Sequence, residues 1–339
     1  MTNQRKPSRS GKAQRTSRLF APLLAALLPQ ASLAAGENPP SEQSEDATTP
    51  QNLPNVVMPT WGGKQFWTDR LIDSGHRIQE NALTGHYRLL DGRNRRLAWG
   101  SFDQCRRKLA ELVADDRQGA CEESTVILLH GLMRSRSSMA SLGEFLAGHG
   151  YRVVNVSYAS SRASLADHAD ALASIVRHLD ASGEVHFVAH SLGSLVVRRF
   201  LAAHLGDDGI LGNRIELGRV VMLGPPNRGS QLARRAARLP MFTLVVGPSV
   251  DTLIQEESDL PQLDRETCEI GVIAGGRGSE QGFNPFIPGD DDLIVAVEET
   301  RLVGASDFLV LPVVHTYMMN DRRVQQQTLQ FLRSGRFIE

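Results

Sequence analysis

From Ser124 onward, the sequence alternates short apolar segments with longer segments of helical periodicity. The apolar segments predict strands at 126–129, 151–156, 185–189, 219–223, 270–274 and 308–313. The periodic segments predict helices at 137–148, 165–179, 191–204 and 323–332. Strands that are apolar on both faces are typical of parallel sheets covered by helices on both sides. Residues 123–339 are therefore predicted to form an α/β domain with a mostly parallel central sheet.

The first 34 residues have the pattern of an export signal. A basic stretch ends at Arg18, an apolar run covers 19–28, and small residues lead to a predicted cleavage site after Ala34 or Ala35. The apolar run is shorter than the ~20 residues that a membrane-spanning helix needs. We expect an exported protein, periplasmic or secreted, with an uncleaved membrane anchor as the alternative.

Removing this segment changes the charge of the chain. Residues 1–34 hold six Lys or Arg and no Asp or Glu, which leaves 31 basic and 38 acidic residues, a net charge of −7. Nucleic-acid binding needs clustered positive charge, so a nucleic-acid partner is not expected. No protein partner is predicted either.

Two segments precede the α/β domain. Residues 35–55 have the composition of a disordered linker. Residues 56–122 are expected to form an extension packed on the main domain, with a helix at 67–78 and an edge strand at 85–90. Export permits a disulfide between Cys105 and Cys121, with unpaired thiols as the alternative, and Cys268 is interpreted as a small buried hydrophobe.

The sequence Val188-Ala189-His190-Ser191-Leu192-Gly193 lies where a predicted strand gives way to a predicted helix. A serine at such a sharp turn is exposed at the end of the sheet, and small residues two positions before and after it let the strand and helix approach. The helix N-terminus adds partial positive charge beside the hydroxyl. Ser191 is therefore the candidate nucleophile.

The first strand of the domain ends at His130-Gly131-Leu132. A tight turn at Gly131 would direct the backbone N–H of Leu132 into the site, where it would form an oxyanion hole with the N–H of Leu192. His130 is interpreted as a structural residue that braces this loop, since a general base is expected later in the chain.

A candidate acid and base follow the later strands. Asp292 lies in the run 290–292, after the strand at 270–274, and His315 follows the last strand. His315 would take the proton from Ser191, and Asp292 would orient the imidazole. Asp291 is the alternative acid, and a solvated turn or a calcium site are the other interpretations of the acidic run.

Together these motifs resemble the α/β-hydrolase superfamily, and within it small bacterial lipases and esterases. The motifs at His130-Gly131, Ser191, Asp292–Val295 and His315 occur in the order typical of the superfamily, and the segment 223–230 is similar to a stretch that such lipases often contain. Ala189 stands at a position that also holds Ala in some bacterial lipases, and Leu293 stands where the superfamily often has Gly. The resemblance implies a Ser191–His315–Asp292 triad and an acyl-enzyme intermediate.

The resemblance also implies a cap or lid, for which 230–268 is the candidate, with more core helix as the alternative. Its apolar side chains suit an ester or lipid substrate and a transient contact with a lipid surface. No cofactor or metal is expected. The alternative functions are an acyltransferase with the same nucleophile, a non-catalytic binding protein on a hydrolase scaffold, and a peptidase.

Overall fold

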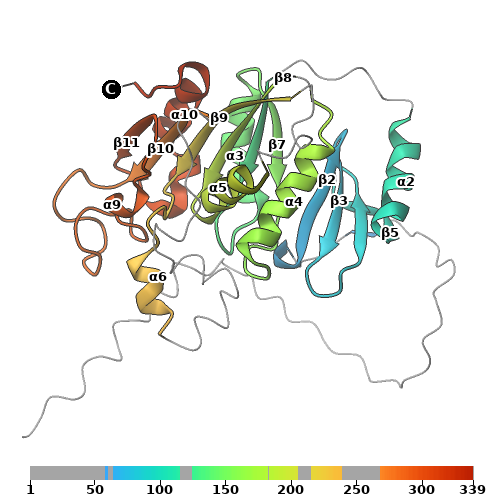
Figure 1. Ribbon diagram of the computed structural model, residues 1–339, viewed down its shortest axis with the longest axis horizontal. Coiled ribbons are helices and arrows are strands. Elements are labelled where there is room, and N and C mark those ends of the chain that lie inside the picture. Colours follow the sequence, from blue (N-terminus) through green and yellow to red (C-terminus); the bar gives the residue numbers. More distant parts are fainter. Residues whose placement is uncertain are drawn as a thin grey trace, which may run out of the picture. The chain divides into compact units, whose positions relative to one another are not determined.

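Six strands form one parallel sheet in the computed structural model of the chain (Figure 1). The structure describes residues 58–59, 64–114, 124–181, 183–204, 215–238 and 268–338. The strands follow the order β11-β10-β9-β8-β6-β7 and comprise β6 (Thr125–Leu129), β7 (Arg152–Val156), β8 (Gly183–His190), β9 (Ile215–Leu223), β10 (Ile270–Gly275) and β11 (Asp307–Leu311). The predicted α/β fold is confirmed.

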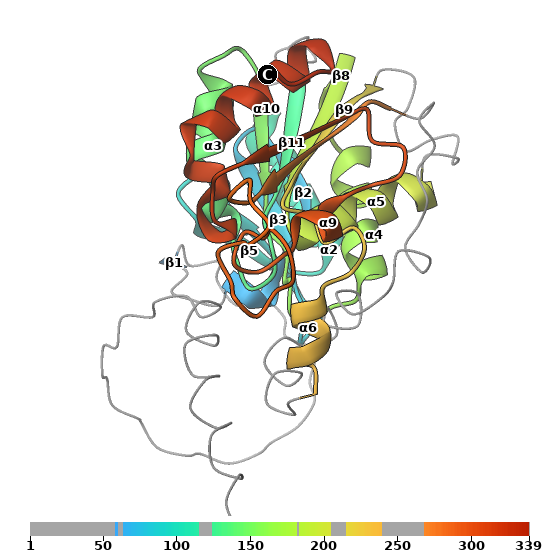
Figure 2. The same cartoon turned by 90° about the vertical axis from the view of Figure 1, so that its left-hand side faces the viewer.

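Helices cover both faces of this sheet. Figure 2 shows α3 (Ala140–Ala147) and α10 (Arg322–Ser334) on one side, and α4 (Leu165–Arg177) and α5 (Leu192–His204) on the other. Each face has its own apolar core, which includes Phe331 and Leu142 on the first side and Phe187 and Phe200 on the second, all four fully buried. Burial of one such side chain contributes roughly 1.5–3 kcal/mol, so these two cores hold the layers together.

The strand order places a candidate site at one end of the sheet. The chain moves from β6 outward to β7, then crosses back to β8 on the other side of β6 and continues outward to β11. The loops after β6 and β8 therefore leave the sheet in opposite directions. A crevice forms at such a point, beyond the carboxyl ends of the strands.

A second sheet precedes the parallel one. Its strands are antiparallel in the order β1-β5-β4-β3-β2, with bounds β1 (Met58–Pro59), β2 (Trp67–Asp73), β3 (His76–Asn81), β4 (Tyr87–Leu90) and β5 (Arg95–Gly100). Helix α2 (Phe102–Val113) covers one face, and the short 3-10 helix η1 (Lys64–Phe66) leads into β2.

The helix predicted at 67–78 was wrong. The segment forms a hairpin of β2 and β3, which turns at Ser74 (φ 46°) and Gly75 (φ 75°). Two successive residues with positive φ match the twist of a tight hairpin, and the Ser-Gly pair supplies that turn. The strand predicted at 85–90 is present as β4, but it lies between β3 and β5 rather than at an edge.

Four other predictions concern residues that lie wholly or partly outside the described part of the chain. Cys105 is buried beneath the second sheet, while Cys121 lies outside the described residues, so the proposed disulfide stays a prediction. Of the predicted lid, α6 (Gln231–Ala236) is described and 239–267 is not. The predicted signal segment 1–34 and linker 35–55 also lie outside the described residues. In the part of the chain that is described, no helix is both long and apolar enough to cross a membrane.

Candidate active site

Ser191 occupies the junction between β8 and α5 in a strained backbone conformation, with φ 53°. Its N–H donates a hydrogen bond to the carbonyl of Leu223 at the end of β9, over 2.9 Å. A Cβ atom on Gly193 would lie only 2.8 Å from the carbonyl oxygen of His130, so glycine is required where α5 approaches the end of β6. Positive φ at a non-glycine residue costs of order 1–3 kcal/mol and is found mainly where function demands it.

The loop after β6 lies directly against this junction. A Cβ atom on Gly131 would lie 3.1 Å from Cβ of Ser191 and 2.8 Å from Nδ1 of His190. Met133, at φ 55°, completes the turn, and its N–H donates to the hydroxyl of Ser160 over 2.9 Å. The structure thus brings the backbone on either side of Leu132 close to Ser191.

The N–H groups of Leu132 and Leu192 were both predicted to face the site. Leu192 is the first residue of α5, and helix N-termini carry N–H groups without an intrahelical acceptor. Neither N–H donates a hydrogen bond to another of the residues that the structure describes. The lack of an acceptor there agrees with the predicted oxyanion hole, which stays a prediction.

His130 braces the loop rather than facing the solvent. Its ring stacks on Tyr158 with centroids 4.3 Å apart, and its Nδ1 lies 2.9 Å from the carbonyl oxygen of Gly131. The Tyr158 hydroxyl also donates to the His130 carbonyl. Burial lowers the pKa of His130 to about 4, so the ring is neutral at physiological pH. These contacts agree with the structural interpretation of His130.

Asp292 and His315 form a buried pair. Nδ1 of His315 lies 2.6 Å from Oδ2 of Asp292, and the His315 N–H donates to the Asp292 carbonyl over 2.9 Å. The other carboxylate oxygen, Oδ1, accepts from the N–H groups of Ile294 and Val295. A carboxylate at Nδ1 keeps the proton on that nitrogen, which leaves Nε2 of His315 free to act as a base.

The other two aspartates of the run hold the loop. Asp291 is buried and accepts hydrogen bonds from the N–H groups of Asn284 and Leu293, while Asp290 accepts from the N–H of Arg277. Burial raises the pKa of Asp291. Asp292, and not its neighbours, contacts His315, so the geometry favours the first choice of acid over the alternative.

The three predicted residues Ser191, Asp292 and His315 lie at the same end of the sheet. His190, next to Ser191, has its Nε2 3.0 Å from the His315 carbonyl, and the two rings lie 4.6 Å apart. Gly224 follows Leu223, the acceptor of the Ser191 N–H, and a Cβ atom there would lie 3.0 Å from Nδ1 of His315. His190, which precedes Ser191, and Gly224, which follows the acceptor of the Ser191 N–H, therefore both lie next to His315.

Sequence reasoning missed the residues that support these groups. His190 was interpreted only as part of the serine motif, yet its ring holds the His315 backbone. Ser160 and Gln65 were not singled out, although Ser160 binds the Met133 N–H and donates to Gln65. No motif marks these contacts. Among the described residues, no group of three or more His, Cys, Asp or Glu side chains is arranged to hold a metal ion.

Comparison with known families identifies the fold. The model of the alpha/beta hydrolase family matches residues 126–331, which is more than half of the chain. The protein therefore belongs to the alpha/beta hydrolase family. A comparison with curated proteins finds no significant match.

Solved structures of similar fold include bacterial lipases and esterases. The lipase BlEst2 of Bacillus licheniformis is 19% identical, with a TM-score of 0.49, and the match covers 66% of this chain and 95% of that one. The esterase RhEst1 of Rhodococcus sp. ECU1013 is 16% identical, with a TM-score of 0.43 and coverage of 62% and 91%. A thermophilic esterase of Thermogutta terrifontis is 18% identical, with a TM-score of 0.41 and coverage of 64% and 92%.

Proposed function

We propose that the protein hydrolyses carboxylic esters through an acyl-enzyme intermediate on Ser191. The observation that carries this proposal is the strained serine at the strand–helix junction, placed at the same end of the sheet as the buried His315–Asp292 pair. Membership of the alpha/beta hydrolase family supports it further, because members of this fold use that arrangement for hydrolysis.

In the first step, Nε2 of His315 removes the proton of the Ser191 hydroxyl as Oγ attacks the ester carbonyl carbon. The carbonyl oxygen becomes an oxyanion, which accepts hydrogen bonds from the N–H groups of Leu132 and Leu192. Asp292 stabilises the imidazolium that forms. When the tetrahedral intermediate collapses, the ester C–O bond breaks, and His315 donates its proton to the leaving alcohol.

In the second step, His315 removes a proton from water, and the resulting hydroxide attacks the acyl carbon. The Ser191–acyl bond breaks, and the proton returns to Oγ of Ser191. The carboxylic acid leaves, and the protein is restored. Removing one oxyanion donor typically costs about 3 kcal/mol of transition-state stabilisation, so both N–H groups matter to the rate.

Exposed apolar side chains favour an apolar ester. Phe286, Leu293 and Tyr317 are at least 42% exposed. The first two lie in the loop that carries Asp292, and Tyr317 lies in the 3-10 helix η4 (His315–Asn320), which begins at His315. Large apolar groups exposed beside a polar centre are typical of ligand-binding surfaces. We therefore propose a lipid-like or other apolar acyl ester as the substrate, hydrolysed after export of the protein through the predicted signal in residues 1–34.

The experiment is labelling of the purified protein with a fluorophosphonate probe, followed by peptide mapping and a panel of p-nitrophenyl esters. We expect one labelled peptide, containing Ser191, and loss of label and turnover in Ser191→Ala. The matched control is Ser194→Ala, which removes a buried hydroxyl three residues further along α5 that donates to the Ala189 carbonyl. Labelling lost equally in both variants, or absent from a folded wild-type protein, would contradict the proposal.

A further inference from the structure

The second sheet has two unlike faces. One is apolar and packs Leu71, Ile78 and Leu89 against helix α2. The other carries Asp69, Arg77 and Gln79, which are all less than 9% exposed although they are polar or charged. Burying charge is costly unless the groups are paired, and these three are paired: the Asp69 carboxylate accepts from Arg77 over 2.7 Å and from Gln79 over 2.8 Å.

The polar face meets the carboxyl end of β7. The N–H of Asp69 donates to the Ser157 carbonyl over 2.9 Å, and Oδ2 of Asp69 accepts from the Ser157 N–H over 2.7 Å. Nearby, the N–H of Ala159 donates to the Thr68 hydroxyl. These bonds join β2 to the segment after β7 and fix the spacing between the two sheets.

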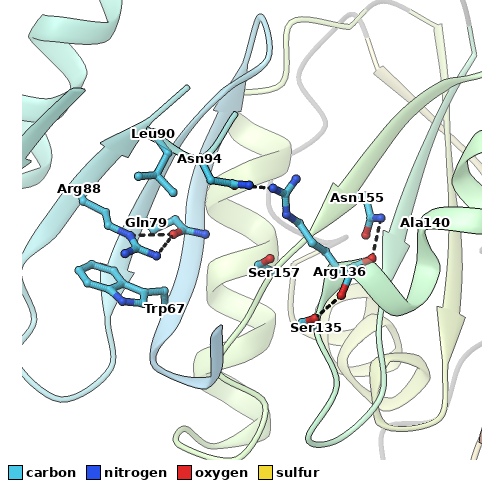
Figure 3. Close-up of a pocket in the computed structure, with 11 residues that line it drawn as sticks. Trp67, Gln79, Arg88, Leu90, Asn94, Ser135, Arg136, Ala140, Asn155 and Ser157 are labelled. Atoms are coloured by element: carbon cyan, nitrogen blue, oxygen red, sulfur yellow. Dashed lines mark hydrogen bonds between the residues drawn. The ribbon is translucent and has the colours of Figure 1, made fainter. Parts of the chain in front are cut away.

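A cavity of about 360 Å³ lies between the two sheets at this point. Trp67, Gln79 and Arg88 line it from the second sheet, and Arg136 and Asn155 line it from the α/β domain (Figure 3). Figure 3 shows the Arg136 side chain extending from the segment after β6 toward the second sheet.

Both arginines of the cavity are held by neutral partners. Arg88 donates from Nε and Nη2 to Oε1 of Gln79, over 3.0 and 2.8 Å, and Arg136 donates from Nη2 to Oδ1 of Asn94 over 2.6 Å. Amide oxygens orient a guanidinium group but carry no charge to neutralise it. The carboxylate of Asp69 attracts both groups, but it is already paired with Arg77 at 2.7 Å.

The cavity therefore has an excess of positive charge in a partly desolvated place. Burial lowers the pKa of Arg88 to about 10 and also lowers that of Arg136, but both groups keep their proton at neutral pH. An anion that enters the cavity would offset the cost of partly burying these two charged groups. Charge-assisted hydrogen bonds from guanidinium groups to phosphate or carboxylate are among the strongest that proteins form.

Two further features shape the site. The Arg88 guanidinium lies 3.7 Å from the centroid of the Trp67 ring, so the indole supports the cation in a fixed plane. Asn155 donates from Nδ2 to the Arg136 carbonyl over 2.9 Å, while its Oδ1 is buried and has no hydrogen-bond partner among the described residues. An unpaired buried acceptor is unfavourable, and Asn155 lines the cavity, so a small movement of its amide that exposes Oδ1 to a ligand hydroxyl would satisfy this oxygen.

We propose that this cavity binds the phosphate group of a hydroxyl-bearing phosphate ester, with Arg88 and Arg136 binding the phosphate and Asn155 accepting from the hydroxyl. Two guanidinium groups match the charge of a phosphate monoester better than that of a single carboxylate. The ester can be a free small molecule or a phospholipid headgroup, since both present the same chemistry. The site is separate from the proposed ester hydrolysis, because none of its residues belongs to the triad.

The test measures binding in the Ser191→Ala protein, so that turnover cannot intervene. Isothermal titration calorimetry with glycerol 3-phosphate and with inorganic phosphate, at constant ionic strength, examines the free ligands. Co-sedimentation with vesicles that contain phosphatidylinositol 4-phosphate, whose headgroup carries a phosphate monoester and free hydroxyls, examines the headgroup. We expect saturable binding, with glycerol 3-phosphate tighter than inorganic phosphate if the ester is free, or binding to vesicles alone if the ligand is a headgroup.

Variants then assign the binding to the cavity. Arg88→Gln and Arg136→Gln should each weaken binding at least tenfold, and Arg136→Lys, which keeps the charge, should weaken it less. Arg322→Gln is the matched control, because Arg322 is an exposed arginine on α10. No binding of any of the three probes, or binding that the Arg88→Gln and Arg136→Gln changes leave unaltered, would overturn the proposal. Failure of the protein to react with the fluorophosphonate probe would contradict the proposed ester hydrolysis but not this binding proposal.

Discussion

Gln65, in the short 3-10 helix η1 that leads into β2, donates a hydrogen bond from Nε2 to the carbonyl oxygen of Arg134 over 2.5 Å. Its Oε1 accepts from the Ser160 hydroxyl over 3.2 Å, and the same hydroxyl accepts from the Met133 N–H. One side chain of the extension thus supports the loop that carries the Leu132 N–H. Oxyanion donors contribute most when they are held in place before the reaction begins.

Replacing Gln65 should therefore affect the rate more than substrate binding. We expect Gln65→Ala to lower kcat by about three- to tenfold with little change in KM, because a looser loop weakens contacts made only in the transition state. Steady-state kinetics on a soluble ester measures this. The control is Gln330→Ala on α10, which removes an exposed amide that donates to the Ser334 hydroxyl at the end of the same helix. An unchanged kcat in Gln65→Ala would show that the loop does not depend on this contact.

Asp292 and its neighbour Asp291 should respond differently to replacement by asparagine. Asp292→Asn removes the charge at His315 Nδ1 and permits the wrong tautomer, so kcat should fall by about 10²- to 10⁴-fold while the fold is retained. Asp291→Asn should leave most of the activity and lower stability instead, since Asp291 accepts only loop N–H groups. Kinetics and urea unfolding of both variants distinguish these outcomes. Equal kinetic loss in both would contradict the assignment of Asp292 as the triad acid.

The α/β domain could be predicted from the sequence because its signals are local. Each strand of the parallel sheet is a short apolar run, and β6 and β8 are almost wholly buried. The motifs around Ser191 and His315 follow directly from these strands, so finding the strands also located the candidate site. Chain order then separated His315 from the other histidines.

The second sheet could not be predicted in the same way. Trp67–Ile78 was interpreted as a helix, because its apolar residues are few and the Ser74–Gly75 turn was not recognised as a hairpin signal. The contacts that matter most there join residues far apart in sequence, such as Gln65 and Arg134. The spacing of residues within one segment carries no information about such pairs. The cavity and the support that Gln65 gives to the loop after β6 were therefore found only from the structure.

Leu293 offers a test of backbone strain beside the candidate acid. Its φ is 86°, a conformation that favours glycine, and its side chain is 42% exposed. Leu293→Gly should be more stable than Leu293→Ala by about 1 kcal/mol, because both remove the side chain but only glycine relieves the backbone. Urea unfolding of the two variants measures the difference. Lower stability of the glycine variant would show that the loop carries no strain at this position.

Buried histidines predict how stability depends on pH. Burial lowers the pKa of His130 and of His168 to about 4, below the ordinary value of 6.5, and also lowers that of His190. Between pH 6.5 and about 4 the unfolded chain therefore binds protons that the folded chain does not. The buried neutral histidines therefore contribute fully to the free energy of unfolding above pH 6.5, and this contribution is lost as the pH falls. The free energy of unfolding then decreases by up to about 1.4 kcal/mol per pH unit for each histidine.

His168→Asn isolates one of these groups away from the candidate triad. Urea unfolding of this variant and of the wild type at several values between pH 4.5 and 7.5 gives two stability curves. Because all other titrating groups are shared, the difference between the curves reports His168 itself. We expect the variant to lose less stability than the wild type on acidification, by up to about 1.4 kcal/mol per pH unit below pH 6.5. Parallel curves would mean that His168 takes up a proton in the folded protein as readily as in the unfolded chain.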